Sequence, residues 1–201
     1  MLLALDAMGV LYASGDDVAE LLIPFVHSKG SQITPDEVER EYLAASLGRI
    51  DAATFWQRVG LDSTVEDEYL RGHRLVPGVL DLLDSARRVF EGVCCISNDV
   101  SRWSEKLRRS FLLDQAIHPW IISADVGVRK PSVGIYDCLL KKVDACPDSV
   151  VLVDDRPKNL DTARAAGMRT VLFDPGGKIC GGDHRRVRQL SEILHLPAEW
   201  A

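Results

Sequence analysis

Apolar runs of strand length recur along this chain, and they constrain its fold more than any other feature. The segments 2–6, 92–97 and 150–155 are apolar up to their last one or two positions, which is typical of strands buried on both faces of a parallel sheet. Two further strands are expected at 120–123 and 169–173, and the sequence between the strands has helical periodicity. The sequence therefore predicts an α/β fold built on a parallel sheet.

A helical block follows the first strand, and no convincing strand interrupts it. Thr34 followed by Pro35 is a strong helix start, and Pro24 implies a kink or an early stop. Because this block directly follows the first strand, we expect a helical cap domain at 13–75 over a core domain formed by 1–12 and 76–201. The expected helices cover 18–26, 34–47, 51–59, 64–72, 79–88, 101–111, 132–142, 158–166 and 184–194.

Composition restricts the class of partner. The 201 residues are 46% hydrophobic and 27% charged, with a net charge of −6, and no Lys/Arg run stands out. This argues against a nucleic acid or an anionic membrane as partner and favours a small molecule. Strand-like sequence begins at residue 2, which leaves no room for a signal peptide, and no apolar stretch is long enough to span a membrane. We expect a cytoplasmic protein, either a monomer or a homodimer.

Polar residues stand at the ends of four of the predicted elements. The carboxyl ends of parallel strands meet at one edge of a sheet, so these residues are expected to lie close together. Each alone could be an ordinary strand-end residue, but three carboxylates, a hydroxyl and an ammonium together suit a divalent cation such as Mg²⁺ and a phosphate. They are Asp6, Ser97 with Asn98, Lys130, and Asp154 with Asp155.

These residues resemble the motifs of the haloacid dehalogenase superfamily. Asp6-Ala7-Met8-Gly9-Val10 matches D-x-D-G-[TV] except at the second aspartate, and Ser97-Asn98 matches a strand ending in Ser or Thr. Lys130-Pro131 fits the third motif, and Asp154-Asp155-Arg156-Pro157-Lys158-Asn159 fits D-D-x-x-x-N. The resemblance covers about 2–173 and is greatest to the branch of glucose-1-phosphatases, 2-haloacid dehalogenases and the phosphatase domains of some epoxide hydrolases.

The resemblance implies a Rossmann-like sheet with strand order 5-4-1-2-3 and a Mg²⁺-dependent phosphatase that acts on a small phosphorylated metabolite. Asp6 would be the nucleophile that forms an aspartyl-phosphate. Ser97 and Lys130 would hold the phosphoryl oxygens, and Asn98 would shape the phosphate pocket. Mg²⁺ would be held by Asp6, the Met8 carbonyl and Asp155, with Asp154 acting directly or through water.

Met8 stands where the phosphatases have their general acid, and its side chain cannot transfer a proton. Three alternatives therefore stay open: a catalytically impaired protein that binds phosphorylated ligands, a dehalogenase, and a phosphonatase-like hydrolase. Metal-free dehalogenation has no evident use for the Asp154-Asp155 pair. A phosphonatase-like mechanism would need Lys29, the only lysine of the cap block. Tyr12, Arg49, Phe55 and Trp56 are candidate cap residues for substrate choice, although aromatic residues at helical spacing are more often core.

Overall fold

A parallel sheet forms the centre of the computed structural model, which describes residues 1–196. The order β3-β2-β1-β4-β5-β6 extends the predicted order by one edge strand and otherwise confirms it. Leu5 pairs with Cys95 on one side and Val153 on the other, so the central strands end at the same level. The strands are β1 (Leu2–Leu5), β2 (Gly92–Ser97), β3 (Trp120–Ile122), β4 (Val150–Asp154), β5 (Arg169–Phe173) and β6 (Arg185–Val187).

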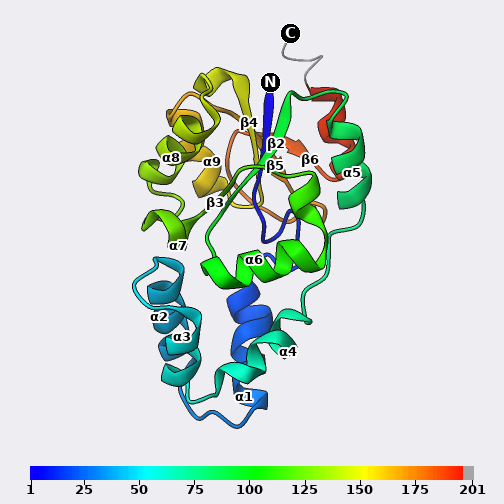
Figure 1. The fold of residues 1–201 in the computed structure, drawn as a ribbon. Coiled ribbons are helices and arrows are strands. Elements are labelled where there is room, and N and C mark those ends of the chain that lie inside the picture. Colours follow the sequence, from blue (N-terminus) through cyan, green and yellow to red (C-terminus); the bar gives the residue numbers. More distant parts are fainter. Residues whose placement is uncertain (197–201) are drawn as a thin grey trace.

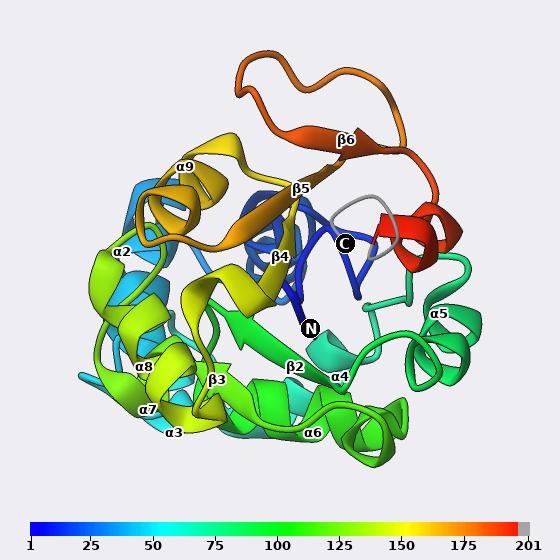
Figure 2. The same ribbon diagram turned by 90° about the horizontal axis from the view of Figure 1, so that it is seen from above.

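Helices cover both faces of the sheet (Figures 1 and 2). Strand side chains alternate between the faces, so Leu3 and Leu5 join one hydrophobic cluster while Ala4 joins the other. Helices α8 (Val133–Val143) and α9 (Pro157–Ala165) cover one face, and α5 (Val79–Ala86) and the 3₁₀ helix η5 (Leu190–His195) lie at the other. Helix α6 (Ser101–Ser110) and the short α7 (Ser123–Val126) lie toward the carboxyl ends of the strands.

The segment between β1 and α5 is helical and lies beyond the carboxyl ends of the strands (Figure 1). A π-helical turn, η1 (Val18–Leu22), continues into α1 (Ile23–Ser28), and Pro24 lies at their junction, where the helix changes type without ending. Helix α2 (Pro35–Ser46) begins at a capping box formed by Thr34 and Glu37. The remaining elements are α3 (Ala52–Arg58), η2 (Ser63–Val65) and α4 (Glu66–Leu70).

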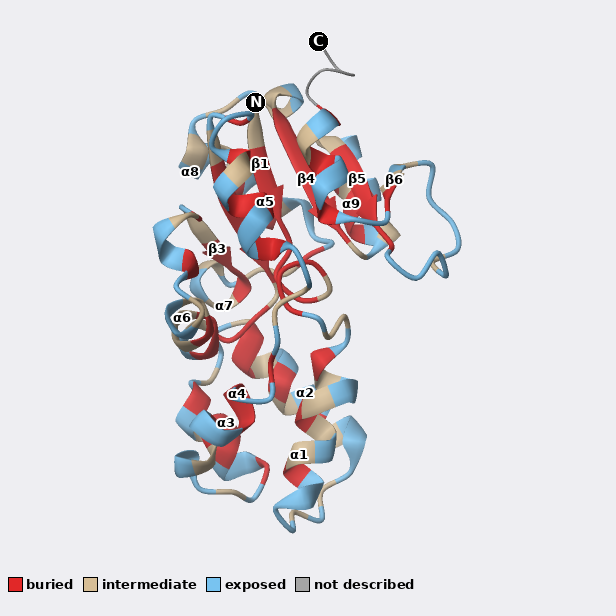
Figure 3. Ribbon diagram, turned by 90° about the vertical axis from the view of Figure 1, so that its right-hand side faces the viewer, coloured by how far each residue is buried: buried red, intermediate tan, exposed pale blue. Residues whose placement is uncertain are grey.

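The helical segment and one face of the sheet share a continuous hydrophobic core (Figure 3). Tyr12, Phe55 and Trp56 are at most 1% exposed and belong to this core together with Trp103 of α6. Their large apolar side chains therefore pack the interior and do not face a ligand. No helix among residues 1–196 has the length and apolar character needed to cross a membrane.

The prediction of a closing helix at 184–194 was wrong. Arg185–Val187 forms β6, which pairs in parallel with Val171–Phe173, and only Leu190–His195 is helical, as a 3₁₀ helix. The Asp174 N–H donates to the Val187 carbonyl at 2.9 Å, and Val187 is buried. The open edge of β5 thus supplies backbone hydrogen bonds that helical periodicity in the sequence does not reveal.

Candidate active site

Asp6 follows β1 directly and is 6% exposed. Its Oδ1 accepts a hydrogen bond from the Ala7 N–H at 2.6 Å and lies 2.8 Å from Lys130 Nζ. Its Oδ2 accepts no hydrogen bond within the described chain. The chain then turns at Gly9, whose φ of +79° favours glycine, and a Cβ there would lie 2.3 Å from Asp155 Oδ2. The glycine therefore permits the close approach of the first loop to the last motif.

Lys130 joins two strand ends from within the protein. Its Nζ is 2.7 Å from Asp154 Oδ2 and 2.8 Å from Asp6 Oδ1, and its side chain is fully buried. The side chain of Asn98 fixes the Lys130 backbone: Asn98 Nδ2 donates to the Lys130 carbonyl at 2.9 Å, and the Lys130 N–H donates to Asn98 Oδ1 at 2.7 Å. Asn98 lines the cavity, but these two bonds occupy its amide in positioning the lysine.

Asp154 and Asp155 are adjacent in sequence and differ in how their oxygens are paired. Asp154 Oδ1 accepts from the Arg156 N–H and Asn159 Nδ2, and its Oδ2 accepts from Lys130 Nζ and Asn159 Nδ2. Each oxygen has two acceptor sites, so no acceptor site of Asp154 is left free. Asp155 Oδ1, in contrast, is buried without a hydrogen-bond partner in residues 1–196.

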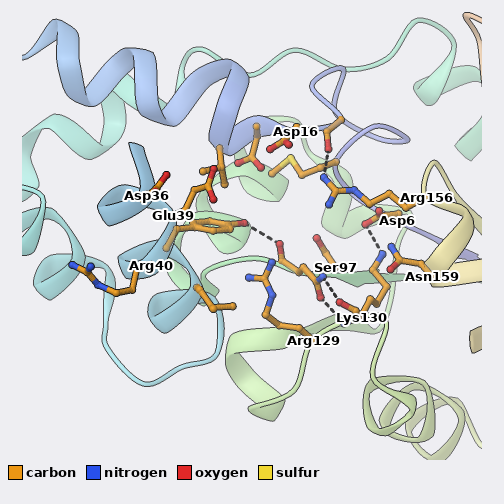
Figure 4. A pocket seen from close by; sticks show the side chains of 17 residues that line it. Asp6, Asp16, Asp36, Glu39, Arg40, Ser97, Arg129, Lys130, Arg156 and Asn159 are labelled. Atoms are coloured by element: carbon orange, nitrogen blue, oxygen red, sulfur yellow. Dashed lines mark hydrogen bonds and ion pairs between the residues drawn. The ribbon is translucent and has the colours of Figure 1, made fainter. Parts of the chain in front are cut away.

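Ser97 is the last residue of β2, and its hydroxyl is buried without a hydrogen-bond partner from the described residues. Buried polar atoms are rarely left unpaired. Ser97 lines the same cavity as Asp6 and Lys130. Ser97 and Asp6 come from neighbouring strand ends and Lys130 from the loop after α7, and the three side chains converge there (Figure 4). The hydroxyl is thus available to a ligand in the cavity.

The charges at this edge do not balance. Burial raises the pKa of Asp6, and Asp154 and Asp155 add to the increase against the opposing effect of Lys130, to a value of about 8. Burial and Asp154 raise the pKa of Asp155 to about 6. Burial lowers the pKa of Lys130, but Asp154 and Asp6 together raise it above its ordinary value. One ammonium therefore does not compensate three carboxylates.

The three carboxylates at this edge lie close enough together to surround a cation, although the oxygens of Asp154 are already paired. Asp6, Asp154 and Asp155 each offer an oxygen, and these oxygens lie within 4.8 Å of one another. The unpaired Asp155 Oδ1 supplies an independent reason for a ligand. Carboxylate oxygens of this kind fit Mg²⁺, which takes one or two protein carboxylates and completes its shell with water and phosphate oxygens.

A cavity of about 480 Å³ opens over these residues, between the strand ends and α2. Sequence analysis proposed seven site residues, of which Asp6, Met8, Ser97, Asn98 and Lys130 line the cavity. The other two, Asp154 and Asp155, are not among its lining residues. Sequence analysis did not propose the other lining residues, although Arg129 precedes Lys130, and Arg156 and Asn159 lie inside the D-D-x-x-x-N motif. The additional residues are Gly15, Asp16, Asp17, Val18, Asp36, Glu39, Arg40, Tyr42, Leu43, Arg129, Arg156 and Asn159 (Figure 4).

Two cap residues considered from the sequence lie away from this cavity. Lys29 Nζ bonds both Glu68 carboxylate oxygens at 2.7 Å and does not line the cavity. Arg49 lines a different cavity, beside α6. Neither residue is placed to contact a group bound at Asp6.

Comparisons with known proteins agree on one protein family. The model of haloacid dehalogenase-like hydrolases matches residues 1–167. The chain is 38% identical over 77 residues to drimenol cyclase drtB of Aspergillus calidoustus, covering 38% of this chain and 13% of that protein. It is 33% identical over 103 residues to haloacid dehalogenase-like hydrolase domain-containing protein 3 of Xenopus laevis, covering 50% of this chain and 41% of that protein. The chain thus spans less than half the length of either relative.

Solved structures with the same fold include phosphatases and dehalogenases. A HAD phosphatase from Thermococcus onnurineus is 22% identical with a TM-score of 0.73, over 97% of this chain and 96% of that one. A 2-haloacid dehalogenase from Pseudomonas syringae is 20% identical with a TM-score of 0.74, over 100% and 99%. The HAD hydrolase YfnB from Bacillus subtilis, solved with magnesium, is 16% identical with a TM-score of 0.70, over 98% and 97%. At these identities the likeness shows the fold.

Proposed function

The chain belongs to the haloacid dehalogenase-like hydrolases, and we propose that it is a Mg²⁺-dependent phosphatase that acts through an aspartyl-phosphate on Asp6. The observation that carries the proposal is the pair of buried, unpartnered oxygens, Asp155 Oδ1 and Ser97 Oγ, on the two sides of Asp6. A carboxylate oxygen favours a cation, and a hydroxyl favours a phosphoryl oxygen. Together they support a phosphate ester as substrate.

In the proposed site, Asp6 and Asp155 hold Mg²⁺ with the Met8 carbonyl, and the ion supplies positive charge beside the transferring phosphoryl group. Asp154 has no free acceptor site, so we assign it to positioning Lys130 and to at most a water-mediated contact with the ion. Residues 13–75 act as a cap whose side chains choose the substrate.

Asp6 attacks phosphorus with a carboxylate oxygen, and the Ala7 N–H and Lys130, which contact its Oδ1, keep the carboxylate in position. The Lys130 ammonium and the Ser97 hydroxyl contact the phosphoryl oxygens and offset their charge in the transition state. Asn98 keeps the lysine at this position through its two bonds to the Lys130 backbone. Water then cleaves the aspartyl-phosphate and restores Asp6.

A protein that binds phosphorylated ligands without turnover is the second candidate, because Met8 occupies the cavity beside Asp6 and carries no transferable proton. Dehalogenation has less support, since it leaves the unpaired Asp155 oxygen unexplained. Lys29 gives no support to a phosphonatase-like reaction, because it is bonded to Glu68 outside the cavity.

The test uses p-nitrophenyl phosphate, whose leaving group needs protonation least. The wild type should hydrolyse it with Mg²⁺ and not after chelation by EDTA. Asp6→Asn should lower turnover by at least about 10³-fold, because the amide is nearly isosteric but a far weaker nucleophile. Asp84→Asn, at an exposed position of α5, is the control and should retain activity. Hydrolysis that survives in Asp6→Asn would remove Asp6 from the mechanism.

A further inference from the structure

A fourth carboxyl group, that of Asp17, lines the same cavity as Asp6 and Met8. Asp17 is 5% exposed and stands at the start of η1, where an aspartate would ordinarily cap the helix. It makes no capping hydrogen bond. The cap is supplied by Asp16, whose Oδ1 accepts from the Ala19 N–H at 3.3 Å. Helix capping therefore does not explain why Asp17 is buried.

The other contacts of Asp17 leave one oxygen free. Tyr69 Oη donates to Asp17 Oδ2 at 3.1 Å, while Oδ1 accepts no hydrogen bond from the part of the chain that is described. No lysine or arginine forms an ion pair with it there. Burying a carboxyl group with a single neutral partner costs free energy, which is characteristic of a functional position more than of a structural one.

The chain around Asp17 passes directly over the proposed metal site. Arg156 Nη2 donates to the Gly15 carbonyl at 2.8 Å, which ties this segment to the end of β4. A Cβ at Gly15 would lie 2.8 Å from Asp155 Oδ2. Asp17 follows two residues later and is held from the other side by Tyr69 of α4. Asp17 is thus bonded to the helical segment through Tyr69, while Gly15, two residues earlier, is tied to the end of β4, and both residues line the cavity.

We propose that Asp17 is the general acid and base of this enzyme, in the role that Met8 cannot fill. This inference rests on the proposed phosphatase function. A departing alkoxide needs a proton, and a carboxyl group in the lining of the cavity can supply one. The sequence gives no sign of this role because Asp17 lies eleven positions after Asp6 and precedes a helix.

The two steps balance. In the first, an Asp6 oxygen forms a bond to phosphorus while the bond from phosphorus to the ester oxygen breaks, and the ester oxygen keeps the electron pair and takes the proton of Asp17. In the second, the Asp17 carboxylate removes a proton from water as the water oxygen bonds to phosphorus. The bond from phosphorus to Asp6 breaks, and the electron pair returns to the Asp6 carboxylate. Alcohol and phosphate are the products.

The electrostatic setting suits an acid that works near neutral pH. Burial raises the pKa of Asp17 to about 6, against the lowering effect of the Tyr69 hydrogen bond, so part of the population carries the proton at pH 7. The charged and titratable groups that face it come from several elements. They are Asp16, Tyr42, Tyr69, Asp99, Arg129 and Arg156.

The experiment compares Asp17→Asn with the wild type on ethyl phosphate and p-nitrophenyl phosphate, both with Mg²⁺. We expect the variant to lose ethyl phosphate hydrolysis by about 10²–10⁴-fold. With p-nitrophenyl phosphate it should release a burst of about one equivalent of p-nitrophenolate and then turn over slowly, because the first step needs no acid and the second lacks its base. Hydroxylamine trapping of the accumulated acyl phosphate checks the burst.

Two further variants make the test specific. Asp174→Asn changes another buried carboxyl group, one that pairs with Arg186 and does not line the cavity, and should leave the ratio of the two ester rates unchanged. Met8→Asp in the Asp17→Asn background should restore part of the ethyl phosphate hydrolysis.

Several outcomes would overturn the assignment. The assignment is wrong if Asp17→Asn hydrolyses both esters at wild-type rates, or if it loses the burst as well as ethyl phosphate hydrolysis. It is also wrong if the wild type cleaves only the aryl ester. If the wild type cleaves neither ester, the proposed function fails and the inference fails with it.

Discussion

Buried carboxylates at two places in the molecule, Glu66 beside α6 and the three aspartates at the sheet edge, are compensated in opposite ways. Glu66 of α4 is 3% exposed and accepts from Trp56 Nε1 at 3.2 Å and Trp103 Nε1 at 2.9 Å. Arg102 Nε and Lys106 Nζ lie 2.7 and 2.6 Å from its Oε1. At the sheet edge, three carboxylates share one ammonium, and Asp155 Oδ1 has no partner in residues 1–196.

The pKa values of Glu66 and Asp6 reflect this difference in pairing. Burial raises the pKa of Glu66, but hydrogen bonds from Lys106, Arg102 and Trp103 lower it below its ordinary value. Burial dominates at Asp6 and raises its pKa to about 8. The fully paired carboxylate joins α4 to α6 and stabilises the fold, whereas the underpaired group keeps free oxygens for a ligand. Burial alone therefore does not distinguish a structural acid from a functional one; the count of donors does.

The largest expected effect on stability tests the structural side of this comparison. Glu66→Gln should lower the free energy of unfolding by about 3 kcal/mol, because the amide loses two charge pairs and presents donors to donors. The matched control is Glu41→Gln, since the ion-pair partners of Glu41 within residues 1–196 are Arg40 and Arg58, whose side chains are more than half exposed. That change should cost at most about 1 kcal/mol. Urea unfolding measures both, and equal losses would contradict the distinction.

The role of the sheet-edge carboxylates as metal ligands is tested by the change in protein stability when Mg²⁺ is added. A ligand that binds only the folded state stabilises it by about 2.7 kcal/mol at one hundred times its dissociation constant. The wild type should gain this amount, whereas Asp155→Asn should gain almost nothing. Without the metal the variant should be at least as stable as the wild type, because one of three adjacent carboxylates is removed. Thermal unfolding with and without Mg²⁺ measures both effects, and an equal gain in the variant would exclude Asp155 as a ligand.

The arrangement of strand ends could be predicted from the sequence because each apolar run ends in a polar residue and parallel strands end together. That logic brings Asp6, Ser97, Asp154 and Asp155 to one edge, where the structure places them. It does not separate Asp154 from Asp155. Their difference depends on Asn159 and the Arg156 N–H, and no spacing rule specifies which oxygen those donors reach.

Other features depend on contacts between distant segments. Glu66 lies in the run Glu66-Asp67-Glu68, which has the pattern of an exposed helix start, and only its packing against α6 shows that it is buried. Strand β6 forms by pairing with the open edge of β5, a contact that the local sequence does not indicate. Asp17 directly precedes a helix, where an aspartate ordinarily caps, and only the structure shows that Asp16 forms that bond.

The smallest of the three effects on stability concerns Asp17. Its carboxyl group is buried like that of Glu66, but like that of Asp155 at the sheet edge it receives few hydrogen bonds. Its folded pKa of about 6 lies above the ordinary value of 3.8, so the folded state binds the proton more tightly than the unfolded state does. This contribution to stability is complete below about pH 4 and is lost as the pH rises through 6. The shift sets an upper limit of about 3 kcal/mol, and solvent in the cavity reduces it to the order of 2.

Asp17→Asn removes that dependence, since the amide oxygen can still accept from Tyr69 and carries no charge. The variant should therefore match the wild type near pH 4 and exceed its free energy of unfolding at pH 8 by about 2 kcal/mol, measured by urea unfolding in EDTA. The raised pKa values of Asp6 and Asp155 affect both proteins alike and cancel in the difference. A difference that is the same at both pH values would mean that Asp17 is not held as an underpaired acid. If Asp17→Asn is more stable than the wild type at pH 8 and has lost ethyl phosphate hydrolysis, the Asp17 carboxyl group lowers stability and is needed for catalysis.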